Sequence, residues 1–372
     1  MTAPIIPQAE PRASYYAHRA EIDAAIAGVL EGGTYILGDE VRQFEREFGM
    51  YHAGASTIGV ANGIDAMIIA LRSCGVGPGD GVITVSHAAV ATIAAIEQAG
   101  ATPVLADIKR ATLTLDPASL EKAINTVDLA SIKAIVPVHL YGQPVDMPSV
   151  LALAREHGWL VIEDCAQSVG AMLNDRRSGT WGDIAAFSFH PVSNLGAIGD
   201  GGAVVTSNPR LAERARLIRE HGRCDAHVSE TVGIYSRLDE IQASVLRVKL
   251  RHLDASTARR NEIAARYALG LSSAGVVLPA VCDDVRHAYN QFVIRHRDRD
   301  RLQMRLKAAG VETMVHYPVP IHLQPAWRGL VQQAGTLRET ETAALEVLSL
   351  PMYPEMTDEQ VERVVEAVRS NC

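Results

Sequence analysis

Between about residues 56 and 206, short apolar runs rich in β-branched residues alternate with stretches of helical periodicity. Continuous apolar strands separated by helices are typical of a mostly parallel sheet that is buried on both faces. Binding sites in such sheets lie beyond the carboxyl ends of the strands. The predicted strands are 57–60, 82–85, 103–106, 134–138, 160–162, 185–188 and 203–206. The predicted helices between them are 65–73, 90–99, 119–125 and 147–157.

The alternation stops near Pro209, where longer and more charged helical patterns begin. We predict helices at 209–221, 238–253 and 258–271, with a polar loop at 224–232. Beyond about residue 275 the pattern predicts a strand at 289–295, a helix at 299–309, a strand at 311–315 and a closing helix at 358–370. The chain is therefore expected to be an α/β protein with a large domain over 1–250 and a small α+β domain over 251–372.

Charge and hydropathy exclude several classes of partner. The formal net charge is −8 with no basic block, which argues against nucleic acid and anionic membranes. The chain has no apolar run long enough to span a bilayer and no signal-peptide pattern at its start, so the cytoplasm is the expected location. The five cysteines lack metal-ligand spacing, and no metal site is predicted.

Two motifs place polar residues at strand ends. Asp164 directly follows the strand predicted at 160–162, where a carboxylate can pair with a protonated ring nitrogen, orient a water or cap a helix. Ser188 ends another strand and precedes a glycine-rich turn at 196–202. A strand-end serine can hold a phosphate through its hydroxyl and nearby N–H groups, although a sharp turn alone also explains the glycines.

Five further segments accompany these motifs in order along the chain: 34–45, 59–66, 137–143, 236–243 and 316–324. Together they resemble the DegT/DnrJ/EryC1/StrS family of nucleotide-sugar and aminocyclitol aminotransferases over nearly the whole chain. The closest similarity is to members that act on dTDP-linked 3-keto-6-deoxyhexoses. The resemblance implies the fold-type I, aspartate aminotransferase-like fold of pyridoxal-phosphate-dependent transferases, and a homodimer with active sites at its interface.

The resemblance also assigns roles to single residues. Asp164 matches the acid that pairs with the pyridine nitrogen, Gln167 the residue near the cofactor hydroxyl, and Ser188 a phosphate ligand. The segment 59–66 matches a phosphate loop and includes Gly63. In the small domain, the matched segment brings residues expected to face the substrate cleft, which are His316, Tyr317 and His322.

Four matched positions depart from the family pattern. Ser193 stands where the family has its Schiff-base lysine, and Ala89 stands where an aromatic side chain stacks on the pyridine ring. Tyr235 replaces a phosphate-binding asparagine donated by the other subunit, and Ile64 replaces a frequent threonine. A serine hydroxyl forms no imine and is a weak base at neutral pH, so ordinary amino transfer is not expected from this site.

The leading hypothesis is therefore an enzyme that acts on a keto sugar or similar polar metabolite by acid–base chemistry such as isomerisation, dehydration or rearrangement. Its candidate acid–base groups are Asp164, His87 and His190, with Ser188, Ser193 and Tyr235 as ligand contacts. This hypothesis expects no covalently bound cofactor and leaves loosely held pyridoxal phosphate or pyridoxamine phosphate open.

Two alternatives remain. One is an aminotransferase or dehydratase that uses pyridoxal phosphate or pyridoxamine phosphate without this lysine, which the retained Asp164, Gln167 and Ser188 favour. The other is a non-catalytic partner of an active paralogue, because a site at a dimer interface can be completed by a second chain.

Overall fold

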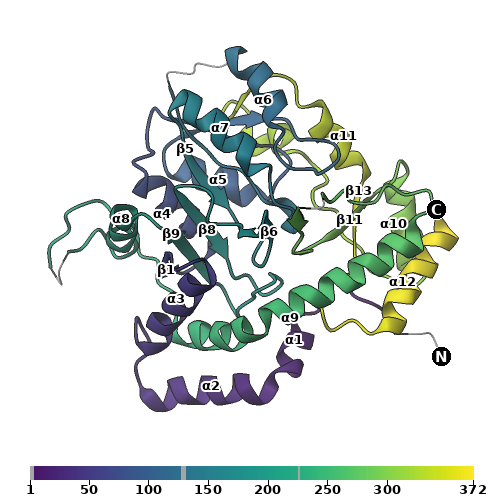
Figure 1. Ribbon diagram of the computed structural model, residues 1–372, viewed down its shortest axis with the longest axis horizontal. Helices are drawn as coiled ribbons and strands as arrows, with labels where there is room; N and C mark the ends of the chain where they lie inside the picture. Colours follow the sequence, from purple (N-terminus) through teal and green to yellow (C-terminus); the bar gives the residue numbers. More distant parts are fainter. Residues whose placement is uncertain (1–3, 127–130, 225–226, 283) are drawn as a thin grey trace.

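Eight strands form one central sheet in the computed structural model of this protein, which describes residues 4–126, 131–224, 227–282 and 284–372 (Figure 1). The strand order is β1-β9-β8-β5-β4-β2-β3-β12. The strands from β8 to β12 run parallel, and β9 and β1 join antiparallel. Their bounds are β1 Ser56–Val60, β2 Gly81–Val85, β3 Thr102–Ala106, β4 Ile132–Ile135, β5 Leu160–Asp164, β8 Ile184–Ser188, β9 Gly202–Thr206 and β12 Gln332–Gln333.

This sheet confirms the predicted α/β class. The expected strand over 134–138 ends earlier, at Ile135, because Val138 makes only an isolated bridge to Asp164. The strands are buried on both faces, as their continuous apolar sequences predict. The helices that follow strands in this part are α4 Gly63–Ser73, α5 Val90–Gln98, α6 Pro117–Ala123, α7 Met147–His157 and α8 Pro209–Arg219.

One long helix, α9 Glu240–Leu271, replaces the two helices predicted at 238–253 and 258–271. The segment between them contains no glycine or proline, and the Thr257 hydroxyl donates to the Leu253 carbonyl at 2.9 Å within the continuing helix. Leu253 and Thr257 are both buried, so packing favours continuation. The helix also runs through the predicted domain boundary at residue 250, and that boundary stays a prediction.

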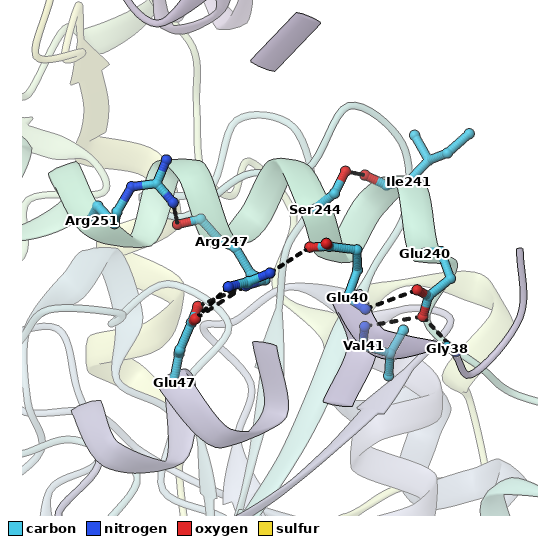
Figure 2. Close-up of polar contacts among 9 residues, drawn as sticks. All are labelled: Gly38, Glu40, Val41, Glu47, Glu240, Ile241, Ser244, Arg247 and Arg251. Atoms are coloured by element: carbon cyan, nitrogen blue, oxygen red, sulfur yellow. Dashed lines mark hydrogen bonds and ion pairs between the residues drawn. The ribbon is translucent and has the colours of Figure 1, made fainter. Parts of the chain in front are cut away.

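Charged side chains fix the start of α9 to α3 Asp39–Tyr51 (Figure 2). The Glu240 carboxylate accepts hydrogen bonds at 2.7, 2.9 and 3.0 Å from the backbone N–H groups of Gly38, Glu40 and Val41. It therefore caps the N-terminus of α3 from another helix. Two helical turns further on, Arg247 binds the carboxylates of Glu47 and Glu40, each with a shortest distance of 2.7 Å.

The C-terminal part has its own apolar core around the far end of α9, including Tyr267 and Leu271. Here β11 Phe292–Arg295 pairs antiparallel with β13 Val347–Leu350, flanked by α10 Arg299–Ala308, α11 Arg338–Glu346 and α12 Asp358–Asn371. The predicted strand at 311–315 is wrong, because Val311 and Met314 form only isolated bridges, to Ile6 and Ser349. The bridge to Ile6 brings the start of the chain into this core.

Two helices near the start, α1 Pro11–Ala17 and α2 Arg19–Gly32, were not predicted, and α2 packs along α9 (Figure 1). A small sheet combines β10 Val285–Arg286, β6 Met172–Leu173 and β7 Arg176–Arg177. The loop predicted at 224–232 falls partly on residues 225–226, which lie outside the described residues. Among the described helices, none combines the length and apolar character needed to cross a membrane.

Candidate active site

A cavity of about 760 Å³ opens where β5 and β8 end, beside the first turn of α4. Its volume falls in the range of roughly 300–1,000 Å³ that is common for small-molecule sites. The residues that sequence reasoning missed here are Asn62, Thr92, Asp200, Asn290 and Gln291. The predicted site residues that line it are Gly63, Ile64, Ala89, Asp164, Gln167, Ser188, His190, Ser193, His316 and Tyr317.

Asp164 is the buried acid of this cavity. Only 7% of its surface is exposed, and it lies at the last position of β5. The Thr92 hydroxyl donates to its Oδ2 at 2.7 Å, and the Ala166 N–H donates to its Oδ1 at 3.1 Å. Burial raises the pKa of Asp164 above its ordinary value, and these two hydrogen bonds offset only part of the rise. A cationic ligand group beside Asp164 would stabilise the carboxylate.

Glu163 precedes Asp164 on β5, and because side chains alternate along a strand it points to the opposite face of the sheet. Its carboxylate is fully buried and accepts from the N–H groups of Gly179, Trp181 and Gly182 at 2.8, 2.6 and 2.7 Å. His139 Nδ1 accepts from the Val145 N–H at 3.0 Å, so His139 Nε2 carries the proton and donates to Glu163 at 2.9 Å. Burial alone would raise the pKa of Glu163, but the donors from His139 and the backbone outweigh it and lower the pKa.

We expect Glu163→Gln to lower the free energy of unfolding by about 3–5 kcal/mol, because its amide would place a donor against buried donors. Urea denaturation measures the change, with the exposed Glu156→Gln on α7 as a control that shifts stability by less than about 0.5 kcal/mol. Since the folded-state pKa of Glu163 is lowered, its contribution is present above the ordinary glutamate pKa of about 4.3 and is lost as pH falls further. A variant as stable as the wild type at neutral pH would contradict this role.

The first turn of α4 forms an anion-binding feature next to Ser188. Asn62 caps the helix by accepting from the Asp65 N–H at 2.8 Å, and the Asn62 carbonyl accepts from Ala66. Within the described parts of the chain, no acceptor takes the N–H groups of Gly63 and Ile64, which is the arrangement that binds phosphates at helix N-termini. A Cβ on Gly63 would lie 2.6 Å from the Ser188 Cβ, so only glycine allows this close approach.

Gln167 links the cavity to the C-terminal part of the chain. Its Oε1 accepts from the Tyr141 N–H at 2.7 Å, and its Nε2 donates to the Tyr317 hydroxyl at 3.1 Å. Burial raises the pKa of Tyr317 to about 12, so this hydroxyl stays protonated at neutral pH. His316 lies next to it, with Nδ1 at 2.8 Å from the Ser349 hydroxyl.

Three predicted site residues do not line this cavity. His87 is buried behind it, with Nε2 at 2.8 Å from the Tyr141 hydroxyl, and burial lowers its pKa to about 4, so an acid–base role in the cavity is not supported by its position. His322 is held by the Ser86 hydroxyl at 2.7 Å. Tyr235 is 64% exposed at the protein surface, stacked beneath the Arg237 guanidinium.

Ser193 lies in a turn after Pro191, where its N–H donates to the His190 carbonyl at 2.8 Å. The turn is anchored by Asn194, whose Nδ2 donates to the Ala288 carbonyl at 2.7 Å and whose Oδ1 accepts from Asn290 at 3.0 Å. All five lysines of the sequence belong to the described residues, and none of them lines the cavity. Ser193 and His190 thus supply a hydroxyl and an imidazole at this edge.

Comparison with known proteins decides the family. A profile of the DegT/DnrJ/EryC1/StrS aminotransferase family matches residues 17–369. The chain belongs to this family. It is 46% identical over 367 residues to the dTDP-3-amino-3,4,6-trideoxy-alpha-D-glucose transaminase of Streptomyces venezuelae, covering 98% of this chain and 96% of that protein.

Solved structures match this chain over nearly its whole length and support the same family assignment. The Streptomyces venezuelae DesV structure, in complex with a ketimine intermediate, matches with a TM-score of 0.95 at 45% identity, covering 99% of this chain and 98% of that one. The NtdA structure from Bacillus subtilis, with bound cofactor pyridoxamine phosphate, matches with a TM-score of 0.90 at 30% identity, covering 99% and 85%.

These structures correct one expectation from the sequence. The departures at Ser193, Ala89 and Tyr235 led to the expectation that no cofactor is bound covalently and that binding of pyridoxal phosphate or pyridoxamine phosphate is doubtful, and that expectation is wrong. Structural relatives over nearly the whole chain carry such a cofactor or an intermediate. Pyridoxal phosphate is therefore the expected cofactor of this family member. The error came from giving the three replaced positions more weight than the retained residues Asp164, Gln167 and Ser188.

Proposed function

We propose that this protein is a nucleotide-sugar aminotransferase that binds pyridoxal phosphate or pyridoxamine phosphate and acts on the keto group of a sugar. The observation that carries the proposal is the joint lining of one cavity by Asp164, Gln167, Ser188 and the first turn of α4. The similarity to the dTDP-3-amino-3,4,6-trideoxy-alpha-D-glucose transaminase of Streptomyces venezuelae supports the sugar substrate.

The residues present fit the cofactor without a covalent anchor at position 193. The Asp164 carboxylate would hold the proton of the pyridine nitrogen, and Ser188 with the free N–H groups of Gly63 and Ile64 would hold the phosphate. When bound, the cofactor supplies an electron sink and a carrier for the amino group. Ala89 leaves one face of the ring position without an aromatic contact, which costs roughly 1 kcal/mol of affinity.

His190 is the side chain that we assign to proton movement. His190 lines the cavity, its backbone N–H donates to the Ser188 hydroxyl at 3.4 Å, and it lies three residues before Ser193. An imidazole can both accept and release a proton, whereas a serine hydroxyl is a poor base at neutral pH. The Tyr317 hydroxyl and Gln167 would orient the cofactor's ring substituents and the sugar.

We also propose a homodimer in which Tyr235 of each chain reaches the cavity of the other. Tyr235 is exposed and lies outside the cavity of its own chain, and the rings of Tyr235 and His221 lie 5.0 Å apart. An exposed aromatic side chain clamped between His221 and Arg237 is typical of an interface residue. Analytical ultracentrifugation of the wild type tests the dimer, and Tyr235→Ala should weaken cofactor binding without unfolding either chain.

The decisive experiment loads the purified protein with pyridoxamine phosphate and adds a dTDP-linked 3-keto-6-deoxyhexose. Amino transfer predicts that pyridoxamine phosphate is converted to pyridoxal phosphate in step with the appearance of a dTDP-amino sugar by mass spectrometry. The proposal would be contradicted if fluorescence titration showed no saturable binding of either cofactor form. A protein that binds the cofactor but releases a dehydrated sugar without amine would replace amino transfer with elimination.

Gly63→Ala is expected to weaken binding of pyridoxal phosphate about 10-fold or more. The added methyl group would lie 2.6 Å from Ser188, so the serine or the helix start must move away from the phosphate position. Fluorescence titration measures the dissociation constant. Ile64→Val is the matched control, because it keeps the N–H group and should change the constant by less than about twofold. Equal affinities for both variants would show that the phosphate binds elsewhere.

A further inference from the structure

A second hollow lies on the far side of the turn that carries Ser193. It is lined by side chains of α9 and by the start of the chain, and it shares Val192, Ser193, Asn290 and Gln291 with the active-site cavity. We call it the rear pocket. The two spaces are therefore separated by a single wall of protein, and a ligand in one contacts residues that line the other.

Two buried cations face the rear pocket. Lys249 is 8% exposed and Arg260 is 6% exposed. Arg260 donates to the carbonyls of Tyr289 and Met352 at 3.0 and 2.9 Å, which are neutral acceptors, and within the described residues no carboxylate forms an ion pair with it. Within the described residues no acceptor holds the Lys249 amine, and burial lowers its pKa while Glu355 alone counteracts the shift. A mostly buried cation that no carboxylate pairs is costly, so an anion bound beside it would stabilise the folded protein.

The wall of the rear pocket carries one positive charge that no carboxylate of the wall balances, so one anion would neutralise it. Glu355 offsets one of the two cations, and its own pKa is raised by burial, which Arg260 and Lys249 only partly counteract. Glu10 is already paired with Arg12 at 3.0 Å. The remaining wall contains Asn194, Ser256 and other hydrogen-bonding side chains.

A divalent metal ion fits this region less well. His18, Glu21 and His252 lie close enough to share an ion at the edge of the pocket. However, the two imidazole rings are stacked at 3.9 Å and 12°, and parallel stacked rings cannot both aim a nitrogen at one ion. Glu21 is also occupied by Arg251 at 2.8 Å, and the nearby Lys249 charge disfavours a cation.

We propose that the rear pocket binds a small carboxylate at the Lys249 amine, on the back of the turn that carries Ser193, with Arg260 adding positive charge to the same pocket wall. The pocket is partly open to solvent and offers about 50 Å³, room for about three to five water-sized groups, which is enough for a small carboxylate such as acetate. A carboxylate there would hold the turn and, through the shared wall, change the affinity of the neighbouring cavity for its cofactor.

The test is calorimetric titration of the cofactor-free protein with sodium acetate, in buffer without other small anions. We expect one saturable site per chain. Lys249→Met, of similar length but without charge, should weaken acetate binding at least tenfold, while the exposed Lys307→Met should leave it unchanged. Acetate should also shift the dissociation constant of pyridoxal phosphate at least threefold in the wild type and not in Lys249→Met.

A second measurement needs no variant. Saturating acetate should slow acylation of Lys249 by an activated ester, measured by peptide mass spectrometry, and should leave Lys307 unaffected. The proposal is overturned if acetate gives no saturable heat, if Lys249→Met binds it as well as the wild type, or if Lys249 is acylated at the same rate with acetate present. Because cofactor-free protein is used, these outcomes are independent of the proposed amino transfer.

Discussion

Ser193→Lys is expected to yield a protein that borohydride locks covalently to pyridoxal phosphate at residue 193. The turn already lies at the cavity edge, held by the Ser193 N–H bond to His190 and by the Asn194 side chain, so the new amine enters a formed site. A lysine amine adds both a covalent anchor and a base. Amino transfer should therefore rise by roughly 10²–10⁴-fold.

The measurement is peptide mass spectrometry after borohydride treatment, together with the rate of amino-sugar formation. Ser272→Lys, at the exposed C-terminal end of α9, is the matched control, and it should show neither labelling at residue 272 nor a faster rate of amino-sugar formation. Failure to label residue 193 would show that the turn does not face the cofactor. Labelling of one of the five native lysines in the wild type would show that this chain provides its amine from another position.

Asp164→Asn is expected to lower the rate of amino transfer by roughly 10²–10³-fold while the protein stays folded. The amide keeps the shape of the side chain and can still accept from Thr92, but it cannot hold the charge that a protonated pyridine nitrogen requires. Cofactor affinity should fall in parallel, and absorbance titration measures it. A variant with wild-type rate and affinity would show that Asp164 does not pair with the cofactor.

The same substitution should stabilise the cofactor-free protein slightly at neutral pH. Since the folded-state pKa of Asp164 is raised, its ionised form costs folding free energy once pH exceeds the ordinary aspartate pKa of about 3.9. The difference in unfolding free energy between variant and wild type should therefore be smallest at low pH and grow as pH rises. Thr92→Val should have the opposite effect, because it removes the 2.7 Å hydrogen bond from the carboxylate.

Local pattern was sufficient for the central sheet and insufficient for elements defined by distant contacts. Apolar runs such as 82–85 predict buried strands because the run itself carries the signal. The helix α9 was divided in the prediction, and three of the four residues between the two predicted parts, Asp254, Ser256 and Thr257, are polar. Tertiary packing nevertheless buries Leu253 and Thr257 and favours one continuous helix. The pairing of Val311 with Ile6 joins residues about three hundred positions apart, which periodicity cannot detect.

The site residues also divide into those that local sequence pattern predicts and those that depend on distant contacts. Asp164 and Ser188 stand at strand ends, so the strand pattern alone brings them near one edge of the sheet. Asn62 could have been found, because an asparagine three residues before Asp65 at a helix start is a capping signal. Thr92 could not, since its hydrogen bond to Asp164 depends on how α5 lies against the sheet. His87 was misjudged because an imidazole in a site-like segment gives no sign of its burial.

The unbroken helix α9 connects α3 to the C-terminal core as one continuous element. It is about 48 Å long at 1.5 Å per residue. Glu240 and Arg247 fasten one end to α3, and Tyr267 and Leu271 embed the other in the C-terminal core. A tilt of only about 5° at the fastened end would swing the distant end by roughly 4 Å. Lys249 and Arg260 lie along its length, so such a tilt would alter the rear pocket and carry the C-terminal core together with it.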